Sequence, residues 1–278
     1  MTANLSLRGR WRRLALGLPT VLSLTPRGWF IPHRYAPLLP PPGTQPPYAA
    51  IEAVFSRSSA AFEAVMDLIE SQAAALYSMR SMLDQSWLPA LDGAATYALM
   101  RDRKPQHVIE IGSGHSTRIL AKALGGMGEI LAIDPAPRAD IAGLPGVQVV
   151  LSTVQAAAPG LFDRLGPGDV LFLDSSHILM PGSDVDLLLN RVLPRLPSGV
   201  LVHIHDIFLP FDYPRVWGWR AYNEQLGVVP LLATGAYAPI FSSVWVSQRL
   251  GARVAESVVA RLPMPGGALA TSLWLEKR

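Results

Sequence analysis

Five short apolar runs alternate with helix-like segments between residues 107 and 206, and this alternation constrains the fold more than any other feature of the sequence. Continuous apolar runs are typical of strands that are covered on both faces. Strands that alternate with helices predict right-handed crossovers and a mostly parallel sheet, which is an α/β fold. The expected strands are 107–111, 129–133, 147–151, 169–173 and 200–204.

The C-terminal part departs from this alternation. A helical stretch at 217–232 is followed by two strand-like runs, 240–246 and 268–275. Because these two runs lie close together in the sequence, we expect them to add an antiparallel edge to the parallel sheet. The region 91–278 is therefore expected to form a single α/β domain.

The N-terminal part is basic and rich in proline. Residues 1–51 contain six arginines and no acidic residue, and residues 37–47 contain six prolines. We expect an arm at 1–48, followed by a helical extension at 49–90 in which apolar residues recur with a helical period. The arm is expected to pack on its own domain or on a partner subunit. In the second case the chain would be a homo-oligomer.

Charge and composition limit the partners and the location of the chain. Outside the arm there is no basic cluster, which argues against a nucleic-acid partner, although a basic arm also suits an acidic membrane surface. Only 13 uncharged residues separate Arg13 from Arg27, fewer than the roughly 20 that a membrane-spanning helix needs. The chain has no cysteine, which excludes disulfides, thiolate metal sites and a cysteine nucleophile. We expect a cytoplasmic location.

A first candidate site follows the expected strand 107–111. Gly112 and Gly114 form a turn before a helix, and the N–H groups at the start of such a helix bind anions. Asp134 ends the next strand, where a carboxylate binds ribose hydroxyls. The residues expected to contact the cofactor are Glu110, Gly112, Ser113, Gly114, Ser116, Thr117, Asp134 and Gln155.

The carboxylate of Glu110 indicates which cofactor this turn binds. Placed directly before the turn, it would repel a pyrophosphate and attract an ammonium or sulfonium group. S-adenosylmethionine carries both of these cations and also a carboxylate and a ribose, so we expect this cofactor in preference to NAD. The alternative is that Glu110 is a structural carboxylate and that the glycines only form a tight turn.

A second candidate site follows the strands 169–173 and 200–204. Asp174 and His177 follow the first of them, and His205 and Asp206 follow the second. The carboxyl ends of parallel strands meet at one edge of a sheet, so these side chains are expected to converge beside the first site. Asp174, His205 and Asp206 are expected to bind a divalent cation that acts as a Lewis acid on a substrate hydroxyl.

His177 or His203 is then expected to accept the proton of that hydroxyl. Each of these residues also has a structural alternative. Asp174 can cap the turn that follows it, His177 can be a histidine at a helix start, and His203 lies inside a strand and can belong to the core.

Four segments together carry a resemblance to a known family: 108–117 (VIEIGSGHST), 131–135 (LAIDP), 171–177 (LFLDSSH) and 202–206 (VHIHD). From about Asp92 to the C-terminus the chain resembles the class I S-adenosylmethionine-dependent methyltransferases. Within them it is similar to the metal-associated subgroup that contains sugar and macrolide O-methyltransferases and a methyltransferase-like cephalosporin hydroxylase.

The resemblance implies a Rossmann-like sheet of seven strands with an antiparallel last strand. It also implies a cation at Asp174 and positions 205–206, and a base at His177. We therefore expect a methyltransferase that methylates a hydroxylated small molecule with the help of a divalent cation, either Mg²⁺ or a transition metal. Two alternatives stay open: an oxygenase of the same fold with a redox metal, and a scaffold subunit without activity.

Overall fold

The computed structural model of the chain describes residues 7–157 and 160–278. The chain divides into two compact units. The smaller unit comprises Met1–Pro46 and Phe211–Tyr222, and the larger comprises Pro47–Pro210 and Asn223–Arg278. The segment 49–90, predicted as a helical extension, lies in the larger unit together with the sheet.

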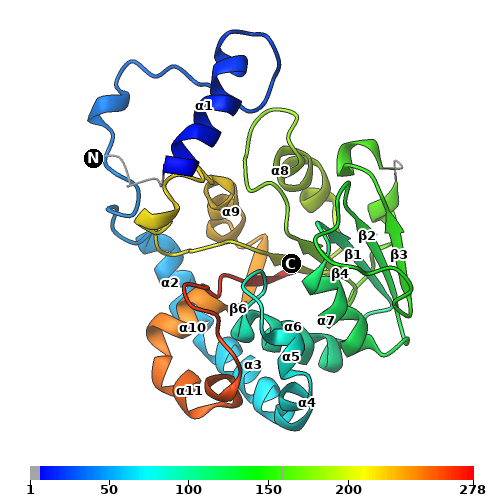
Figure 1. Cartoon of the computed structure of the whole chain (residues 1–278). Helices are drawn as coiled ribbons and strands as arrows, with labels where there is room; N and C mark the ends of the chain where they lie inside the picture. Colours follow the sequence, from blue (N-terminus) through cyan, green and yellow to red (C-terminus); the bar gives the residue numbers. More distant parts are fainter. Residues whose placement is uncertain (1–6, 158–159) are drawn as a thin grey trace. The chain divides into compact units, whose positions relative to one another are not determined.

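The larger unit is built on a seven-stranded sheet (Figure 1). The strand order is β3-β2-β1-β4-β5-β7-β6, and β7 runs antiparallel to the other six strands. The predicted α/β fold with an antiparallel last strand is therefore confirmed. The strands are β1 (His107–Ile111), β2 (Glu129–Ile133), β3 (Val147–Val150), β4 (Val170–Leu173), β5 (Leu201–Ile204), β6 (Tyr237–Ser242) and β7 (Leu273–Lys277).

β7 is the last strand in the sequence but does not form the edge of the sheet. β7 lies between β5 and β6, and β6 forms the edge. Burial explains this order, because Leu273, Trp274 and Leu275 are fully buried whereas burial alternates along β6. β6 also contains Pro239, which cannot donate a backbone hydrogen bond and is tolerated in edge strands.

Helices cover the sheet on both faces, and α6 (Ala90–Arg103) lies beside α7 (His115–Leu124). The predicted helical extension is a series of shorter helices, because the backbone leaves the helical region at Ser58, Gln72 and Met79. The further α-helices of this unit are α2 (Ala49–Arg57), α3 (Ser59–Ser71), α4 (Ala73–Ser78), α5 (Arg80–Leu83), α8 (Asp184–Leu187), α9 (Glu224–Ala233), α10 (Ser243–Arg249) and α11 (Gly251–Glu256).

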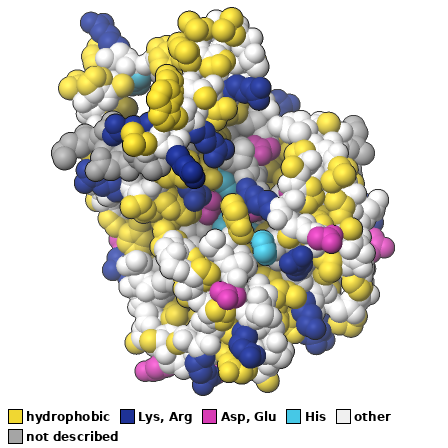
Figure 2. Space-filling view, viewed as in Figure 1, with side chains coloured by type: hydrophobic (Ala, Val, Ile, Leu, Met, Phe, Trp, Pro, Cys, Tyr) yellow, Lys and Arg dark blue, Asp and Glu magenta, His cyan; other side chains and the backbone are white. Residues whose placement is uncertain are grey.

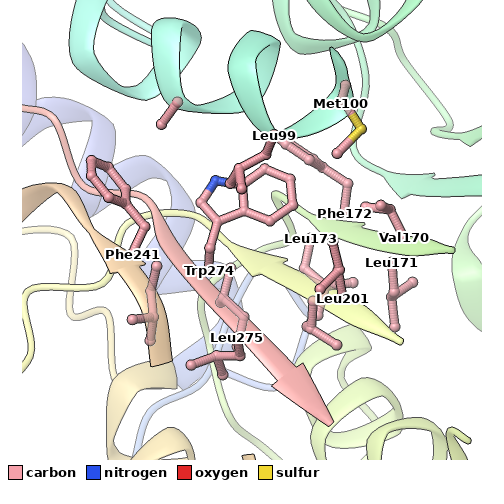
Figure 3. Close-up of a cluster of buried hydrophobic side chains, with 14 of the residues drawn as sticks. Leu99, Met100, Val170, Leu171, Phe172, Leu173, Leu201, Phe241, Trp274 and Leu275 are labelled. Carbon is pink, nitrogen blue, oxygen red and sulfur yellow. The ribbon is translucent and has the colours of Figure 1, made fainter. Parts of the chain in front are cut away.

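The core under α6 is a row of rings on one face of the sheet. Phe172 pairs with His203 across β4 and β5, and His203 pairs with Trp274 across β5 and β7. Figure 3 shows Phe172 and Trp274 directed toward α6, where Leu99 covers them. The rings of Phe172 and Trp274 meet edge to face at 5.9 Å, a geometry that aromatic pairs prefer. This packing fixes the strands whose ends carry the candidate site.

The register of the parallel strands sets that site. Ile111 of β1 lies beside both Ile133 of β2 and Leu173 of β4, and Leu173 lies beside Ile204 of β5. The residues that follow these strand ends are Gly112, Asp134, Asp174 and His205. The shared register places all four at one edge of the sheet, as the sequence predicts.

The smaller unit contains α1 (Leu7–Val21) and the loop 211–222. Arg13 donates a hydrogen bond to the carbonyl of Trp219, and the backbone N–H of Gly43 donates to Asp212. Gly43 has φ +75°, and a Cβ at this position would lie 2.6 Å from the backbone nitrogen of Arg215. Among the described residues, no helix is long and apolar enough to cross a membrane.

Candidate active site at the carboxyl edge of the sheet

The turn after β1 requires glycine at its first position. Gly112 has φ +78°, and a Cβ there would lie 2.0 Å from the carbonyl oxygen of Asp174. Side chains other than glycine are strained at such φ values, and this approach would also be a direct clash. The glycine therefore brings the first site into contact with the end of β4.

Glu110 holds the turn against the start of α7. Its side chain is fully buried, and its two oxygens accept hydrogen bonds from the hydroxyls of Ser116 (2.5 Å) and Thr117 (2.6 Å). The Thr117 hydroxyl in turn accepts from the backbone N–H of Gly114 at 2.9 Å. Burial raises the pKa of Glu110 to about 8, although the two hydroxyls act in the opposite direction.

This geometry bears on the role of Glu110. Glu110 does act as a structural carboxylate, because it fixes the turn through the side chains of Ser116 and Thr117. A carboxylate has about four acceptor positions, so these two hydrogen bonds leave capacity for an ammonium donor. Contact with a cofactor cation therefore stays a prediction, and Glu110 has a positioning role in addition.

Asp134 links the turn to the loop after β2. Its Oδ2 accepts from the backbone N–H of Ser113 at 2.6 Å and from the hydroxyl of the same residue at 3.2 Å. Its Oδ1 accepts from the backbone N–H of Ala136 at 2.7 Å. The side chain thus lies beside the turn, as expected for a ribose ligand, and hydrogen bonds fix its orientation.

His177 lies at the centre of the second site, between three carboxylates. Its Nδ1 lies 2.8 Å from Oε2 of Glu224, which comes from α9. Its Nε2 lies 3.2 Å from Oδ1 of Asp174 and 3.4 Å from Oδ2 of Asp206. The imidazole is therefore oriented by a fully buried carboxylate on one side and directed toward the two strand-end aspartates on the other.

His205 repeats this arrangement. Its Nε2 lies 3.5 Å from Asp92, a fully buried residue of α6. Its Nδ1 lies 3.3 Å from Asp206 and 3.7 Å from Asp174. Asp92 itself accepts hydrogen bonds from the backbone N–H groups of Thr271 and Ser272, at 2.8 and 3.0 Å. Two histidines, each backed by a buried carboxylate, thus face the same pair of aspartates.

The charges of this cluster stabilise one another. Burial alone would lower the pKa of His177, but hydrogen bonds to Asp174 and Glu224 outweigh burial and raise it well above its ordinary value. For His205, the carboxylates of Asp206, Asp92 and Asp174 likewise outweigh burial and raise the pKa to about 9. Burial acts to raise the pKa of Asp174, but the hydrogen bond to His177 and the charge of His205 hold it far below its usual range.

The backbone at the second site is strained. His177 has φ +61° and Asp206 has φ +56°, and neither is a glycine. Each such residue costs on the order of 1 to 3 kcal/mol, a cost that persists only where the surrounding structure imposes it. Both residues lie within four positions of a strand end and direct their side chains into the same cluster. Strain of this kind gathers at functional sites.

Two residues that the sequence predicts in the sites, His203 and Gln155, lie outside the cluster of His177 and His205. His203 is fully buried in β5, where its ring stacks on Phe172 at 3.7 Å and its Nε2 lies 2.8 Å from the hydroxyl of Ser272. Burial lowers the pKa of His203 well below its ordinary value, which favours the packing interpretation over a role as base. Gln155 is exposed in a short 3₁₀ helix, and its amide donates to the carbonyl of Gly182 at 3.3 Å.

The residues predicted to bind a cation come together as ion pairs. The imidazole nitrogens of His177 and His205 that face Asp174 and Asp206 lie directly opposite carboxylate oxygens, as described above. Over residues 7–157 and 160–278, no group of three or more His, Asp or Glu side chains is arranged to hold a metal ion. The divalent cation therefore stays a prediction.

One small cavity is lined by residues of the glycine turn and by residues of the histidine and carboxylate cluster. Ser113 and Ser116 come from the turn, and Asp174 and His205 come from the second cluster. The cavity has a volume of about 10 Å³, roughly what one water molecule needs. Arg138 also lines it, and its guanidinium lies 3.5 Å from Asp174 and 4.5 Å above the ring of Trp87. A cavity of this volume is too small for a cofactor, so its lining must rearrange when a cofactor binds.

Sequence reasoning missed three residues of this site. Asp92 is fully buried at the third position of α6. Glu224 was not singled out at all, and Arg138 lies in a loop without any motif. An acid in the otherwise small and apolar segment 90–100 was the available signal for Asp92.

Comparison with known proteins supports the assignment of the site. Residues 109–207 match a family model described as a methyltransferase domain. The matched segment begins in β1 and ends just after β5, so it contains Glu110, Asp134, Asp174 and Asp206. No curated protein matches the chain significantly.

Similar solved structures are methyltransferases with low identity to this chain. An O-methyltransferase from Bacillus cereus in complex with SAH is 17% identical, covering 70% of this chain and 84% of its own, with a TM-score of 0.36. The plantazolicin methyltransferase BpumL in complex with SAH is 14% identical, covering 81% of this chain and 99% of its own, with a TM-score of 0.40. Likenesses with such TM-scores carry no conclusion about this chain.

The assignment therefore rests on the family match, on the strand order, and on a glycine turn that joins β1 to a helix beside the acid ending β2. Residues 109–207 of this chain are thus similar to a methyltransferase domain.

Proposed function

We propose that the chain methylates a hydroxyl oxygen of a small molecule, and that His177 accepts the proton of that hydroxyl. One observation supports this most: the cavity lined by Ser113 and Ser116 of the cofactor turn is also lined by Asp174 and His205 of the histidine–carboxylate cluster. A methyl donor held at the turn and an acceptor held by the cluster would therefore lie next to each other.

When bound, S-adenosylmethionine supplies an electrophilic methyl group on a positively charged sulfur. The N–H groups at the start of α7 suit its carboxylate, and Asp134 suits its ribose. Ionised Glu110 and Asp174 provide negative charge near its cation. Each of these roles is assigned from the position of the side chain around Gly112, the point at which the two sites touch.

His177 is the better of the two candidate bases because its Nε2 is directed toward Asp174 at the cavity, whereas His203 is enclosed in the core. Glu224 on Nδ1 fixes the ring and raises the pKa of His177. Only the neutral imidazole can accept the proton, so the rate should rise with pH as His177 loses its own proton. Asp206 and Asp174 orient the other nitrogen. We derive no step through a cation, because the described side chains pair with one another and form no ligand shell.

The test is methyl transfer from S-adenosylmethionine labelled in its methyl group to a panel of phenols, catechols, sugars and macrolides. The proposal predicts label in an ether product for at least one hydroxylated class, and loss of that product with His177→Ala. Transfer of label only to nitrogen or sulfur acceptors would contradict it. Measurement with and without added Mg²⁺, Mn²⁺ or chelator decides whether a cation assists.

The same experiment separates the two alternatives. An oxygenase would consume oxygen with bound iron and would leave the label on the cofactor. A scaffold subunit would bind S-adenosylhomocysteine or fail to bind it, but would show no turnover that depends on His177. A homo-oligomer built through the arm, the remaining expectation from the sequence, is tested by light scattering of the full chain.

A further inference from the structure

The helix α1 (Leu7–Val21) exposes an apolar stripe that the described residues of its own unit leave uncovered. None of its residues is buried. The stripe is formed by Leu7, Trp11, Leu14, Leu18 and Val21, which follow the i, i+4, i+7, i+11, i+14 spacing of one helix face. Each is at least half exposed, from 50% for Leu18 to 75% for Leu7. An apolar face of this kind requires a partner.

The exposed apolar surface continues beyond α1. Of the 23 large hydrophobic side chains exposed among the described residues, 14 lie between residues 7 and 39. Three of them are the adjacent residues Trp29, Phe30 and Ile31, which are 55%, 65% and 63% exposed. Figure 2 shows such side chains interspersed with arginines. We call residues 7–39 the arm surface.

The arm surface is also strongly basic. Arg8, Arg10, Arg12 and Arg13 flank the apolar stripe on α1, and the whole smaller unit contains eight arginines but a single acid, Asp212. Within the part of the chain that the structure describes, no carboxylate pairs with an arginine of the arm surface. The charge is therefore available to an anionic partner.

These features decide between the possible partners. A symmetric dimer would place the same basic surface on both sides of its interface, so that like charges would face each other. A spanning helix is excluded for α1, because 15 residues rise only about 22 Å, less than the hydrocarbon thickness of a bilayer. A helix with a narrow apolar stripe containing tryptophan, flanked by arginines, suits the interface of a membrane with anionic lipids.

We propose that the arm surface binds the chain peripherally to an anionic lipid surface, with α1 in the plane of the membrane interface. Its stripe would enter the boundary between headgroups and acyl chains, and its arginines would contact the lipid phosphates. This inference does not depend on the methyl acceptor, because none of the residues involved lies in the catalytic site.

The experiment is co-sedimentation of the full chain with vesicles of phosphatidylcholine alone or with about a third of phosphatidylglycerol. We expect binding to the anionic vesicles that weakens as salt is raised, and at least tenfold weaker binding to the neutral ones. No binding to anionic vesicles at low ionic strength would overturn the proposal, as would equal binding to both vesicle types.

Two arm variants and one matched control sharpen this test. Leu14→Glu with Leu18→Glu should abolish binding, and Arg8→Gln with Arg10→Gln and Arg12→Gln should reduce it at least tenfold. The control Arg191→Gln with Arg195→Gln, in exposed positions of the larger unit, should leave binding unchanged. Thermal unfolding checks that each variant folds. If the leucine variant instead converted a dimer to a monomer in light scattering without lipid, a second copy would be the partner and the proposal would be wrong.

Discussion

Each residue proposed to carry the chemistry is held in place by neighbouring groups and must also contact a ligand. Glu110 illustrates this, since the same carboxylate that anchors Ser116 and Thr117 is the one proposed to attract the cofactor's cation. The identity of this residue is readable from the sequence, but its burial is not. The partners of His177 and His205 are equally hidden, since Glu224 is 47 residues from His177.

The raised pKa of Glu110 predicts how stability depends on pH. In the folded chain the pKa is about 8, above the ordinary value of 4.5. Between these values the folded chain holds a proton that the unfolded chain has lost, so this group's contribution to the free energy of unfolding is present below pH 4.5 and is lost as pH rises through 8. The decline is at most roughly 4 to 5 kcal/mol. Urea unfolding of Glu110→Gln across this range should show a smaller decline than the parent chain.

The same ionisation predicts a difference between two ligands. S-adenosylmethionine carries a positive sulfonium and S-adenosylhomocysteine a neutral sulfur, so only the former gains from ionised Glu110. The affinity ratio of the two should therefore rise between pH 7 and 9 in the parent chain and stay flat in Glu110→Gln. A ratio that does not change with pH in the parent would show that Glu110 only holds the turn.

Substitution of the cluster around His177 separates catalysis from binding. His177→Ala should lower kcat by about 10² to 10⁴, the usual contribution of a positioned base, and change the affinity for S-adenosylhomocysteine little. Glu224→Gln keeps the shape but removes the charge that favours the imidazolium, so it should lower kcat less and leave KM nearly unchanged. His203→Gln is the contrast, since it should lower the melting temperature and leave kcat nearly unchanged.

At the scale of elements, the loop after β2 borders the cavity of the site. Arg138 of this loop lies over Trp87 and beside Asp174, and its backbone lies 3.4 Å from where a Cβ on Gly114 would be. Arg138→Ala should therefore speed S-adenosylhomocysteine association several-fold in stopped-flow measurements, because the guanidinium no longer has to leave Asp174. Arg191→Ala, far from the cavity lining, is the control. Weaker binding by Arg138→Ala would mean instead that Arg138 contacts the cofactor.

The first five strands were predictable to within about one residue, because each is a short, mostly apolar run and four of them are followed by a glycine, an aspartate or a histidine. The C-terminal strands were placed less well. The run 240–246 combines the end of β6 with the start of α10, and apolar content alone does not separate a buried strand from a buried helix. Pro239 was the overlooked sign that β6 is an edge strand.

At the scale of the whole molecule, the sequence predicts one α/β domain and a basic arm, and the structure adds that the loop 211–222 belongs with the arm as a second unit. That association could not be predicted, because it rests on contacts such as Arg13 with Trp219, which are 206 residues apart. Likewise, the convergence of Asp92 with His205 depends on how α6 packs beside β5. Short-range sequence patterns therefore locate the glycine turn and the strand-end histidines and aspartates. Their buried partners, such as Asp92, depend on long-range packing.

The central claim is that the turn after β1 takes S-adenosylmethionine and not a pyrophosphate cofactor. Isothermal titration of the full chain with S-adenosylhomocysteine and, separately, with NAD tests it most directly. The account predicts saturable one-to-one binding of S-adenosylhomocysteine, lost on Gly112→Val, and no measurable binding of NAD. Binding of NAD with no response to S-adenosylhomocysteine would contradict it.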